Sequence, residues 1–559
     1  MKYIYFFVFF FLIYINHTFS QSTKFVVVFK DKTGTPFSIN APQKFLSQRA
    51  IERRIKQKID IDETDLPVNP SYIDQLQISN TVRVLNQSKW LNQACIETID
   101  TSAITKITQL PFVKLVKPVN GTNSQFYNSE NKFKGENIIE KASSLLKGKT
   151  DLSYGNSAAQ INMHEGEFLH NKGFNGKGML IAIIDAGFYH YQTLPAFDSV
   201  RASNRIIDTY DFVNNKISVN EEDAHGMQCF SIIASNIPGI LVGSGTGAQF
   251  LLYKTEDIPT EFPVEEQNWL AAAERSDSAG ADIITTSLGY SVFDNPDFNY
   301  TYKDMNGETT MITRGANQAA KKGMIVVIAA GNEGQNSWHY ISAPADGKGI
   351  LSVGAVNEAG IPASFSSYGP SSDGRTKPEV ASMGVRTAIS STTGNVAFGN
   401  GTSFATPNMA GLTACLWQAF PEFTSAEIIE TIIKSSSIYN SPDDKIGYGL
   451  PNFRIAHELL TKMRIMKNAE RILGGNQIKA YPNPFQDKFT ILIKPKITAT
   501  AQLLLYDISG KLISSKAIET IADQIQIINY NTLPILNKGV YVLKFTTDGN
   551  TESIKLLVN

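Results

Sequence analysis

Three mostly apolar runs constrain the fold of this chain more than any other feature. They are residues 180–184, 281–285 and 324–330. Runs of this kind, bounded by glycine and polar residues, are typical of strands that are buried on both faces of a parallel sheet. A polar side chain follows each run, namely Asp185, Ser287 and Asn332. Because open α/β sheets carry their chemistry at the C-terminal edge of the strands, the pattern predicts an α/β fold, with a mostly parallel sheet flanked by helices and a functional site at that edge.

A serine lies where a sharp turn leads into a helix. Gly401, Thr402 and Ser403 precede the small-residue stretch 407–414, which is typical of a closely packed helix. At such a turn the serine hydroxyl is exposed and its backbone N–H is free to bind an anion, which is what a nucleophile requires. For the serine taken alone, an ordinary N-cap role is the alternative.

A nucleophilic serine needs a base, and the base needs an orienting carboxylate. His225 opens an amphipathic helix, and Asp185 ends the first apolar run. Asp223 is a rival acid, but two residues along one chain is poor geometry for orienting the ring. Asn332 lies between glycines, where it serves either as a left-handed turn residue or as a side-chain N–H donor to an oxyanion.

The order Asp185, His225, Asn332, Ser403, each in these surroundings, resembles the subtilisin-like (subtilase) serine peptidases over about residues 155–460. The resemblance implies that Ser403 attacks the scissile carbonyl, that His225 moves its proton, and that Asp185 holds the imidazole. It also implies an oxyanion site made by the Ser403 backbone N–H and the Asn332 amide.

Residues 287–289 resemble the family segment whose backbone pairs with an extended substrate, so Ser287 and Gly289 are expected to bind substrate. A strand end with a turn glycine is the alternative. The sequence departs from the family pattern at Ala186, where the family usually has a hydroxyl residue, and at Phe404, where it often has methionine. Neither change removes a catalytic group.

Two segments precede the expected peptidase domain, which we place at residues 151–462. Residues 1–20 resemble a secretory signal peptide, because a lysine precedes an apolar run too short to span a membrane; a membrane anchor is the alternative. Residues 21–150 show the order β-α-β-β-α-β, which predicts a ferredoxin-like α+β fold. The subtilase resemblance implies an inhibitory propeptide there, with a stably attached binding module as the rival. The polar stretch 130–156 is expected to be an exposed linker, cut between Gly148 and Asn156.

The C-terminal segment, residues 476–559, alternates short strands with turns and predicts a small β-sandwich. The segment resembles the sorting domain of type IX secretion in Bacteroidetes-type bacteria. The resemblance rests on Tyr-Pro-Asn-Pro-Phe at 481–485, Gly-Val-Tyr-Val-Leu at 539–543 and the terminal residues 555–558. The resemblance implies the type IX machinery as a partner. An accessory sandwich that binds carbohydrate is the alternative.

Composition excludes several classes. A net charge of −1 over 559 residues leaves no electrostatic footprint for nucleic acid. Three scattered cysteines form no disulfide scaffold, and no histidine or cysteine has zinc-ligand spacing. The chemistry is therefore expected to need no cofactor and no metal. The long loop 290–313 carries four acidic residues, and it is either a solvated loop or a structural calcium site.

Together these patterns predict a secreted serine endopeptidase, made as a zymogen and acting on proteins or peptides. It is expected to pass through the periplasm and to reach the medium or the cell surface, with no stable membrane span after signal cleavage. The alternatives are a catalytically weak subtilase-fold surface adhesin or binding protein, and an esterase that uses the same triad. The substrate edge at 287–289 favours peptides over esters.

Overall fold

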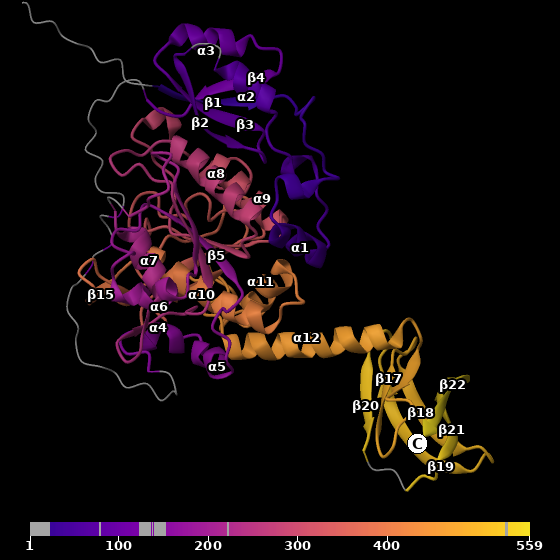
Figure 1. The fold of residues 1–559 in the computed structure, drawn as a ribbon. Helices are drawn as coiled ribbons and strands as arrows, with labels where there is room; N and C mark the ends of the chain where they lie inside the picture. Colours follow the sequence, from indigo (N-terminus) through magenta and orange to yellow (C-terminus); the bar gives the residue numbers. More distant parts are fainter. Residues whose placement is uncertain are drawn as a thin grey trace, which may run out of the picture. The chain divides into compact units, whose positions relative to one another are not determined.

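The structure is a computed structural model that describes residues 23–77, 80–121, 133, 136, 138, 153–220, 223–531 and 535–559. The expected signal peptide and most of the expected linker lie outside these residues. The chain divides into two compact units, residues up to Ala456 and residues from His457 onward (Figure 1). Each unit is described by itself.

The N-terminal domain has the predicted ferredoxin-like plan. Its elements are β1 (Thr23–Phe29), α1 (Gln48–Gln57), α2 (Pro70–Leu76), β2 (Val82–Ser88), β3 (Gln93–Thr98), α3 (Thr101–Thr108) and β4 (Val113–Pro118). The strands form one antiparallel sheet in the order β2-β3-β1-β4. Helix α1 begins at Gln48, three residues later than Phe45, where the sequence predicts it, because the Ser47 side chain accepts a hydrogen bond from the backbone N–H of Ala50 at 3.1 Å and so caps the helix.

Seven parallel strands form the central sheet, as the apolar runs predict. They are β5 (Leu180–Asp185), β6 (Ile206–Asp211), β9 (Gln249–Lys254), β10 (Ile283–Thr286), β11 (Ile325–Ala329), β12 (Leu351–Val356) and β13 (Val380–Met383). The order across the sheet is β13-β12-β11-β10-β5-β9-β6. Ile283 pairs with Ile181 on one side and with Ile325 on the other, so the C-terminal ends of β5, β10 and β11 meet at one edge.

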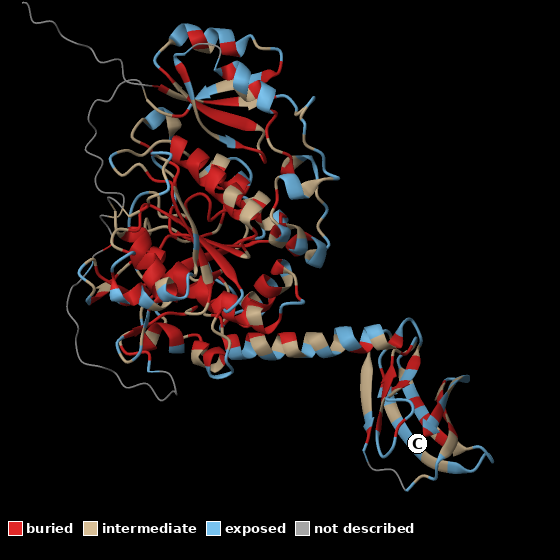
Figure 2. Cartoon of the chain, viewed as in Figure 1, coloured by how far each residue is buried: buried red, intermediate tan, exposed pale blue. Residues whose placement is uncertain are grey.

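Helices cover both faces of this sheet (Figure 1). Helices α8 (Val264–Ala279) and α9 (Met311–Lys321) bury Trp269 and Ile312 against the side chains of Ala182 and Ile184. Helices α7 (His225–Ala234) and α10 (Thr402–Ala419) pack on the other side of the sheet. Figure 2 shows the strands and these helices as the most buried part of the unit. The sheet edge that carries the polar residues is therefore held on a rigid, close-packed core.

Smaller elements complete the first unit. They are α4 (Ala158–Asn162), α5 (Gly166–Asn171), α6 (Asp198–Ala202), β7 (Asn236–Ile237), β8 (Leu241–Val242), β14 (Thr387–Ser390), β15 (Val396–Gly399) and α11 (Ser425–Lys434). Strands β14 and β15 form a hairpin directly before α10. None of the helices in the described parts of the chain is both long and apolar enough to cross a membrane.

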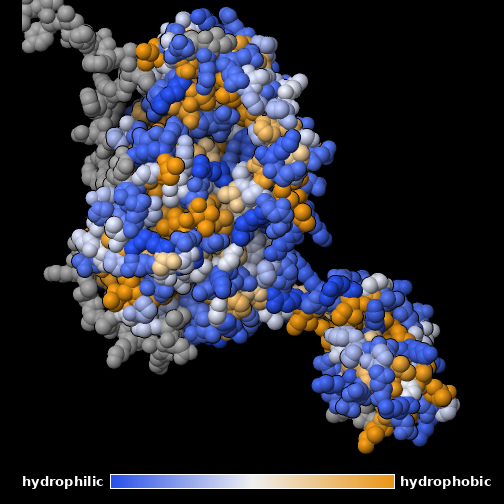
Figure 3. Space-filling model, in the orientation of Figure 1, coloured by the Kyte–Doolittle hydropathy of each residue, from blue (hydrophilic) through white to orange (hydrophobic). Residues whose placement is uncertain are grey.

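The second unit is the predicted β-sandwich. Helix α12 (Phe453–Leu473) leads into β16 (Ile478–Tyr481), β17 (Phe489–Ile493), β18 (Ala499–Asp507), β19 (Leu512–Thr520), β20 (Gln526–Tyr530), β21 (Gly539–Thr547) and β22 (Asn550–Val558). The sheets have the orders β16-β17-β20 and β19-β18-β21-β22, and they share a core that includes Ile491, Leu503 and Leu543. Figure 3 shows one face of each unit. Most of the side chains on that face are hydrophilic, and smaller hydrophobic patches lie among them.

Candidate active site

An acid and a base meet where β5 ends and α7 begins. Asp185 is the last residue of β5 and His225 the first of α7. Oδ1 of Asp185 lies 2.6 Å from Nδ1 of His225 and also accepts a hydrogen bond from the backbone N–H of Ala186 at 2.7 Å. The rival acid, Asp223, instead accepts the backbone N–H of His225 at 2.6 Å. Asp223 therefore holds the start of the helix, whereas Asp185 faces the ring.

The predicted nucleophile lies in the first turn of α10. Helix α10 begins at Thr402, earlier than the small-residue stretch alone suggests, and the preceding Gly401 is extended with φ 164° and ψ 150°. Ser403 is 3% exposed, and its carbonyl accepts the Ser287 hydroxyl at 2.9 Å. This contact joins the end of β10 to the start of α10. The serine is thus fixed at the sheet edge by its backbone, with its hydroxyl free to make other contacts.

The Asn332 amide follows β11 and points into the same site. Its Oδ1 accepts the backbone N–H of Thr402 at 2.9 Å and the Thr402 hydroxyl at 3.0 Å. Because the oxygen is occupied in this way, the Nδ2 group is the one that faces the Ser403 side of the site. An oriented amide N–H beside a helix N-terminus is a suitable place for a negatively charged oxygen.

A residue from the N-terminal side of the chain occupies this place. The Glu136 carboxylate accepts the Ser403 hydroxyl at 2.5 Å and the Asn332 Nδ2 group at 3.1 Å, both on Oε1, and its Oε2 lies 3.0 Å from Nε2 of His225. The Phe133 ring stacks on the imidazole with centroids 3.9 Å apart and an interplanar angle of 12°. The expectation of an exposed linker is wrong at Glu136 and at Tyr154, both of which are buried.

The two carboxylates on either side of the imidazole determine its charge. Burial alone lowers the pKa of His225, but the negative charges of Asp185 and Glu136 and the hydrogen bond that the ring donates to Asp185 outweigh burial and raise this pKa well above 6.5. The His225 side chain is 4% exposed and that of Glu136 is 3% exposed, so solvent screens these charges little. The protonated ring is therefore favoured in this state, and an imidazolium cannot accept a proton from serine.

A cavity of about 700 Å³ opens beside these residues. Ser287, Gly289, Asn332 and Ser403 line it, so the residues expected to bind substrate and those expected to react face one space. Its lining also includes Glu256, Glu261, Asp294 and Glu333. A cleft of this size admits a few residues of an extended peptide.

The acidic loop 290–313 is folded by its own side chains. Oδ2 of Asp304 accepts the backbone N–H of Thr301 at 2.7 Å, and Glu308 forms an ion pair with Lys348. Oδ2 of Asp294 accepts the backbone N–H of Glu261 at 2.9 Å. Whether the loop binds calcium stays a prediction. The three cysteines, Cys95, Cys229 and Cys415, are free and buried.

Sequence profiles of three protein families match this chain. The subtilase family matches residues 176–449, the peptidase S8 propeptide domain of Bacteroidota matches residues 24–134, and a secretion-system C-terminal sorting domain matches residues 479–559. The three matches follow the order of the domains in the fold, and the propeptide match ends two residues before Glu136.

Characterised relatives match the peptidase domain. Serine protease AprX of Bacillus subtilis (strain 168) is 28% identical over 338 residues, which are 52% of this chain and 68% of that protein. Subtilisin of Bacillus pumilus is 29% identical over 294 residues, 52% of this chain and 94% of that protein. A crystal structure of MycP1 from the ESX-1 type VII secretion system aligns with a TM-score of 0.44 at 21% identity, over 58% of this chain and 91% of that one.

Proposed function

We propose that Asp185, His225 and Ser403 form the catalytic triad of this chain. The chain belongs to the subtilase family of serine peptidases and is a secreted zymogen with a sorting domain. The observation that carries the proposal is the convergence of Ser403, His225 and Asn332 on one carboxylate group. The Asn332 amide, which donates to a carboxylate oxygen here, can donate in the same way to the oxyanion of a tetrahedral intermediate, since both carry negative charge on oxygen.

The proposed reaction begins once Glu136 has left the site. The Ser403 oxygen attacks the scissile carbonyl carbon while Nε2 of His225 takes the hydroxyl proton, and Asp185 stabilises the imidazolium that forms. The carbonyl oxygen becomes an oxyanion held by the Asn332 amide and the backbone N–H of Ser403. The imidazolium then gives its proton to the leaving amine, an acyl-enzyme remains, and water releases it by the same steps in reverse.

We propose that the zymogen is latent because Glu136 and Phe133 occupy the catalytic centre. Glu136 places a negative charge where the oxyanion develops, and its charge adds to that of Asp185 in raising the pKa of His225. The Phe133 ring covers one face of the imidazole. A cut in the segment after Glu136 frees the ends of the chain there and allows these side chains to withdraw. The cut position, between Gly148 and Asn156, stays a proposal because residues 139–152 lie outside the described ones.

Active-site labelling tests the triad and the latency together. The secreted wild-type protein and Ser403→Ala are treated with a serine-directed fluorophosphonate, and intact mass identifies the labelled species. We expect label only on the wild type, and at neutral pH much faster labelling of a species that begins after about residue 150 than of the uncut chain. Equal labelling of Ser403→Ala would contradict the assignment. A correctly processed wild type that takes no label would support the rival, a subtilase-fold binding protein.

We propose that hydrolysis needs no cofactor, since the triad and oxyanion donors supply each step. Structural calcium at loop 290–313 is separable from the chemistry. Melting curves with and without a chelator decide it: an unchanged midpoint supports the solvated loop, and a fall of several degrees supports a bound cation. We further propose that residues 476–559 bind the type IX machinery and are removed after export.

A further inference from the structure

Acidic side chains line the cavity beside the proposed catalytic residues. They are Glu256, Glu261, Asp294 and Glu333, and no lysine, arginine or histidine lies among the described residues of the lining. Two of these acids form a tighter group with the buried Glu265, in which one carboxylate oxygen from each residue lies within 4.8 Å of the others. We call Glu256, Glu261 and Glu265 the acidic triplet. Carboxylates this close repel one another, so a positive charge beside them is stabilised.

Residues of the peptidase domain hold the triplet in place. Glu256 is 2% exposed and accepts the Tyr290 hydroxyl at 2.6 Å. Glu265 accepts the backbone N–H of Asp257 at 2.7 Å and that of Phe262 at 3.3 Å. Burial and the charges of the triplet raise the pKa of Tyr290 well above its ordinary value of 10, so this hydroxyl stays a donor. The carboxylates are therefore positioned before any ligand arrives.

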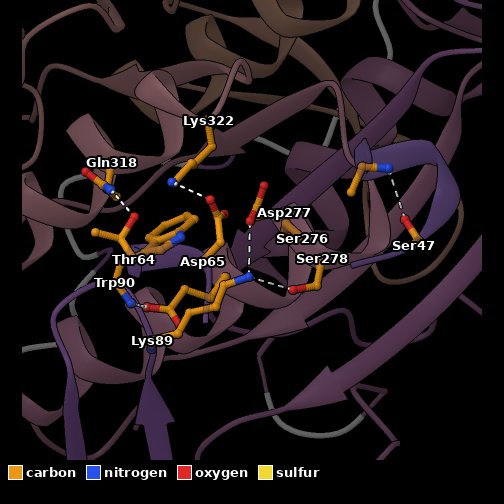
Figure 4. A network of polar contacts seen from close by, with 12 residues as sticks. Ser47, Thr64, Asp65, Lys89, Trp90, Ser276, Asp277, Ser278, Gln318 and Lys322 are labelled. Carbon is orange, nitrogen blue, oxygen red and sulfur yellow. Dashed lines mark hydrogen bonds and ion pairs between the residues drawn. The ribbon is translucent and has the colours of Figure 1, made fainter. Parts of the chain in front are cut away.

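Helix α8 carries buried acids at both of its ends. At the C-terminal end, Asp277 binds Lys89 of the propeptide domain, as Figure 4 shows. At the N-terminal end, Glu265 binds the backbone of the loop that precedes the helix, within the peptidase domain itself. The groups that hold Glu265 are thus still present in the processed enzyme, and the triplet keeps its arrangement there.

A second polar side chain of the cavity also points to a ligand. Ser342 is 4% exposed and lines the cavity, and its hydroxyl makes no hydrogen bond within the described part of the chain. A methyl group at Gly289 would come within 2.4 Å of this hydroxyl oxygen, and one at Gly331 within 2.8 Å. Since buried hydroxyls are as a rule paired, this one is placed to meet a polar group that enters the cavity.

The triplet lies a short way along the substrate edge from Ser403. At the near end of this edge, the Ser287 hydroxyl donates to the Ser403 carbonyl at 2.9 Å. Three residues further along the chain, Tyr290 donates to Glu256. An extended chain rises about 3.3 Å per residue, so a peptide paired with residues 287–289 brings to the triplet a side chain about two to four residues from the bond under attack.

The path of the propeptide region shows on which side of the bond this side chain lies. The backbone N–H of Val264, at the start of α8, donates to the Val119 carbonyl at 3.1 Å, and further along the chain Glu136 accepts the Ser403 hydroxyl. The chain therefore passes the start of α8 before it reaches the nucleophile. A substrate that follows the same path presents to the triplet the residues that precede the scissile bond.

A cationic side chain suits the triplet better than a metal ion does. Both oxygens of Glu265 accept backbone N–H groups, and Oε1 of Glu256 accepts the hydroxyls of Tyr290 and Thr255. Calcium takes about six to eight oxygen ligands, and oxygens that already accept such donors supply them poorly. An ammonium or guanidinium group needs only the negative charge and a few acceptors on the open side of the cavity.

We infer that the processed enzyme selects substrates that carry a lysine or arginine two to four residues before the scissile bond, and that Glu256 and Glu261 determine this specificity with the charge of Glu265 behind them. The inference rests on the proposed catalytic site, because the cavity is a substrate cleft only if Ser403 reacts there. A peptide with a neutral side chain at the same position forgoes the attraction of the triplet, so its transition state is bound less tightly.

The test uses internally quenched peptides that differ in one residue. Lysine is placed in turn at four positions before and four positions after the scissile bond, and norleucine, which has a similar length but no charge, replaces it in the matched peptide. Mass spectrometry locates the cut, and kcat/KM is measured for the processed wild type. We expect lysine to exceed norleucine roughly tenfold or more at one of the positions two to four residues before the bond, and less than about threefold after it.

Three variants connect the preference to the triplet. Glu256→Gln with Glu261→Gln should bring the ratio of lysine to norleucine to within about threefold of unity. Glu261→Lys alone, which also serves if the double variant does not fold, should reverse the preference in favour of glutamate at the same position. Glu430→Gln removes an exposed acid of α11 that pairs with Lys434 outside the cavity, and it should keep the ratio of the wild type.

Fluorophosphonate labelling of the same preparations separates this inference from the proposed function. A wild type that takes the label but cleaves the norleucine and lysine peptides equally fast at every position overturns the inference alone. A processed wild type that neither labels nor cleaves overturns the catalytic assignment as well. If calcium raises the melting midpoint of the wild type but not that of the double glutamine variant, the triplet holds a metal ion, which also overturns the inference.

Discussion

Oε2 of Glu136 lies 3.0 Å from Nε2 of His225, while Oε1 of the same carboxylate accepts the Ser403 hydroxyl at 2.5 Å. One side chain therefore stands between the base and the nucleophile that the base has to activate. Its negative charge accepts the Asn332 amide, which would otherwise face an oxyanion. The contact is made by groups 267 residues apart in the chain, so it exists only while the propeptide region is folded against the peptidase domain.

Glu136→Gln should make the uncut chain reactive. The amide has the size of the carboxylate but no charge, so a buried charge-assisted contact with His225 and Ser403 is lost. We expect the rate of fluorophosphonate labelling of the uncut species to rise at least tenfold, measured by intact mass. Glu63→Gln, which changes an exposed acid of the propeptide domain, should leave the rate unchanged. A Glu136→Gln chain that labels as slowly as its parent would show that the carboxylate does not maintain latency.

The pH dependence of labelling should differ between the uncut and the processed enzyme. Asp185 and Glu136 raise the pKa of His225, so the imidazolium is stabilised below pH 6.5 and the stabilisation is lost as pH rises through the raised pKa. A neutral ring is required for attack, so labelling of the uncut chain should begin at a higher pH than labelling of the processed form. Rate profiles from pH 5 to 10 measure this. Coincident profiles would mean that Glu136 does not act on His225.

Asn332→Ala should lower kcat by about 10²–10³ and change KM little, because the amide binds charge that develops only in the transition state. Thr402→Val is the matched variant: it removes the hydroxyl that holds Oδ1 of Asn332 at 3.0 Å but keeps the backbone N–H that holds it at 2.9 Å. We expect less than a tenfold loss for Thr402→Val. Steady-state kinetics on a peptide substrate give both values, and equal effects of the two variants would argue against an oxyanion role.

Removal of residues 477–559 should leave the protein in the periplasm. The sandwich has its own core and its sequence matches a secretion-system sorting domain. Cell fractionation with immunoblotting measures the distribution between periplasm, surface and medium. In the reciprocal experiment, the same residues fused behind an unrelated periplasmic protein should carry it outside. Normal export of the truncated chain would exclude a sorting role for this domain.

Much of the fold was predictable because its signals are local. Each apolar run forms a strand, and the ferredoxin-like order of the N-terminal domain follows from alternating strand and helix patterns. The positions of Asp185, Ser287 and Asn332 at one edge follow from parallel pairing alone. Helix α1 begins later than the sequence predicts because the Ser47 side chain caps it. Hydrophobic periodicity does not determine a helix boundary to within a few residues.

The contents of the site were less predictable. Glu136 and Phe133 lie in a polar stretch with no periodicity, and nothing in their immediate sequence distinguishes them from solvated residues. Their placement depends on tertiary contacts, those of Phe133 with His225 and of Glu136 with Asn332. The arginines of α1 gave a partial signal, since Arg49 and Arg53 recur at helical spacing on a helix with few apolar residues. Two arginines on one face of a helix need hydrogen-bond acceptors. Only the fold shows that Arg49 and Arg53 donate to the Gly280 and Lys322 carbonyls, which follow α8 and α9.

The close approach of α7 to β5 fixes the spacing between the acid and the base. A methyl group at Gly226 would come within 2.8 Å of Cβ of Asp185 and 2.6 Å of the Gly187 carbonyl oxygen. The spacing between acid and base is thus set by main chain against main chain, with no room for adjustment by side chains. A larger residue at position 226 would push α7 away from β5, and it would separate His225 from Asp185 without removing either catalytic group.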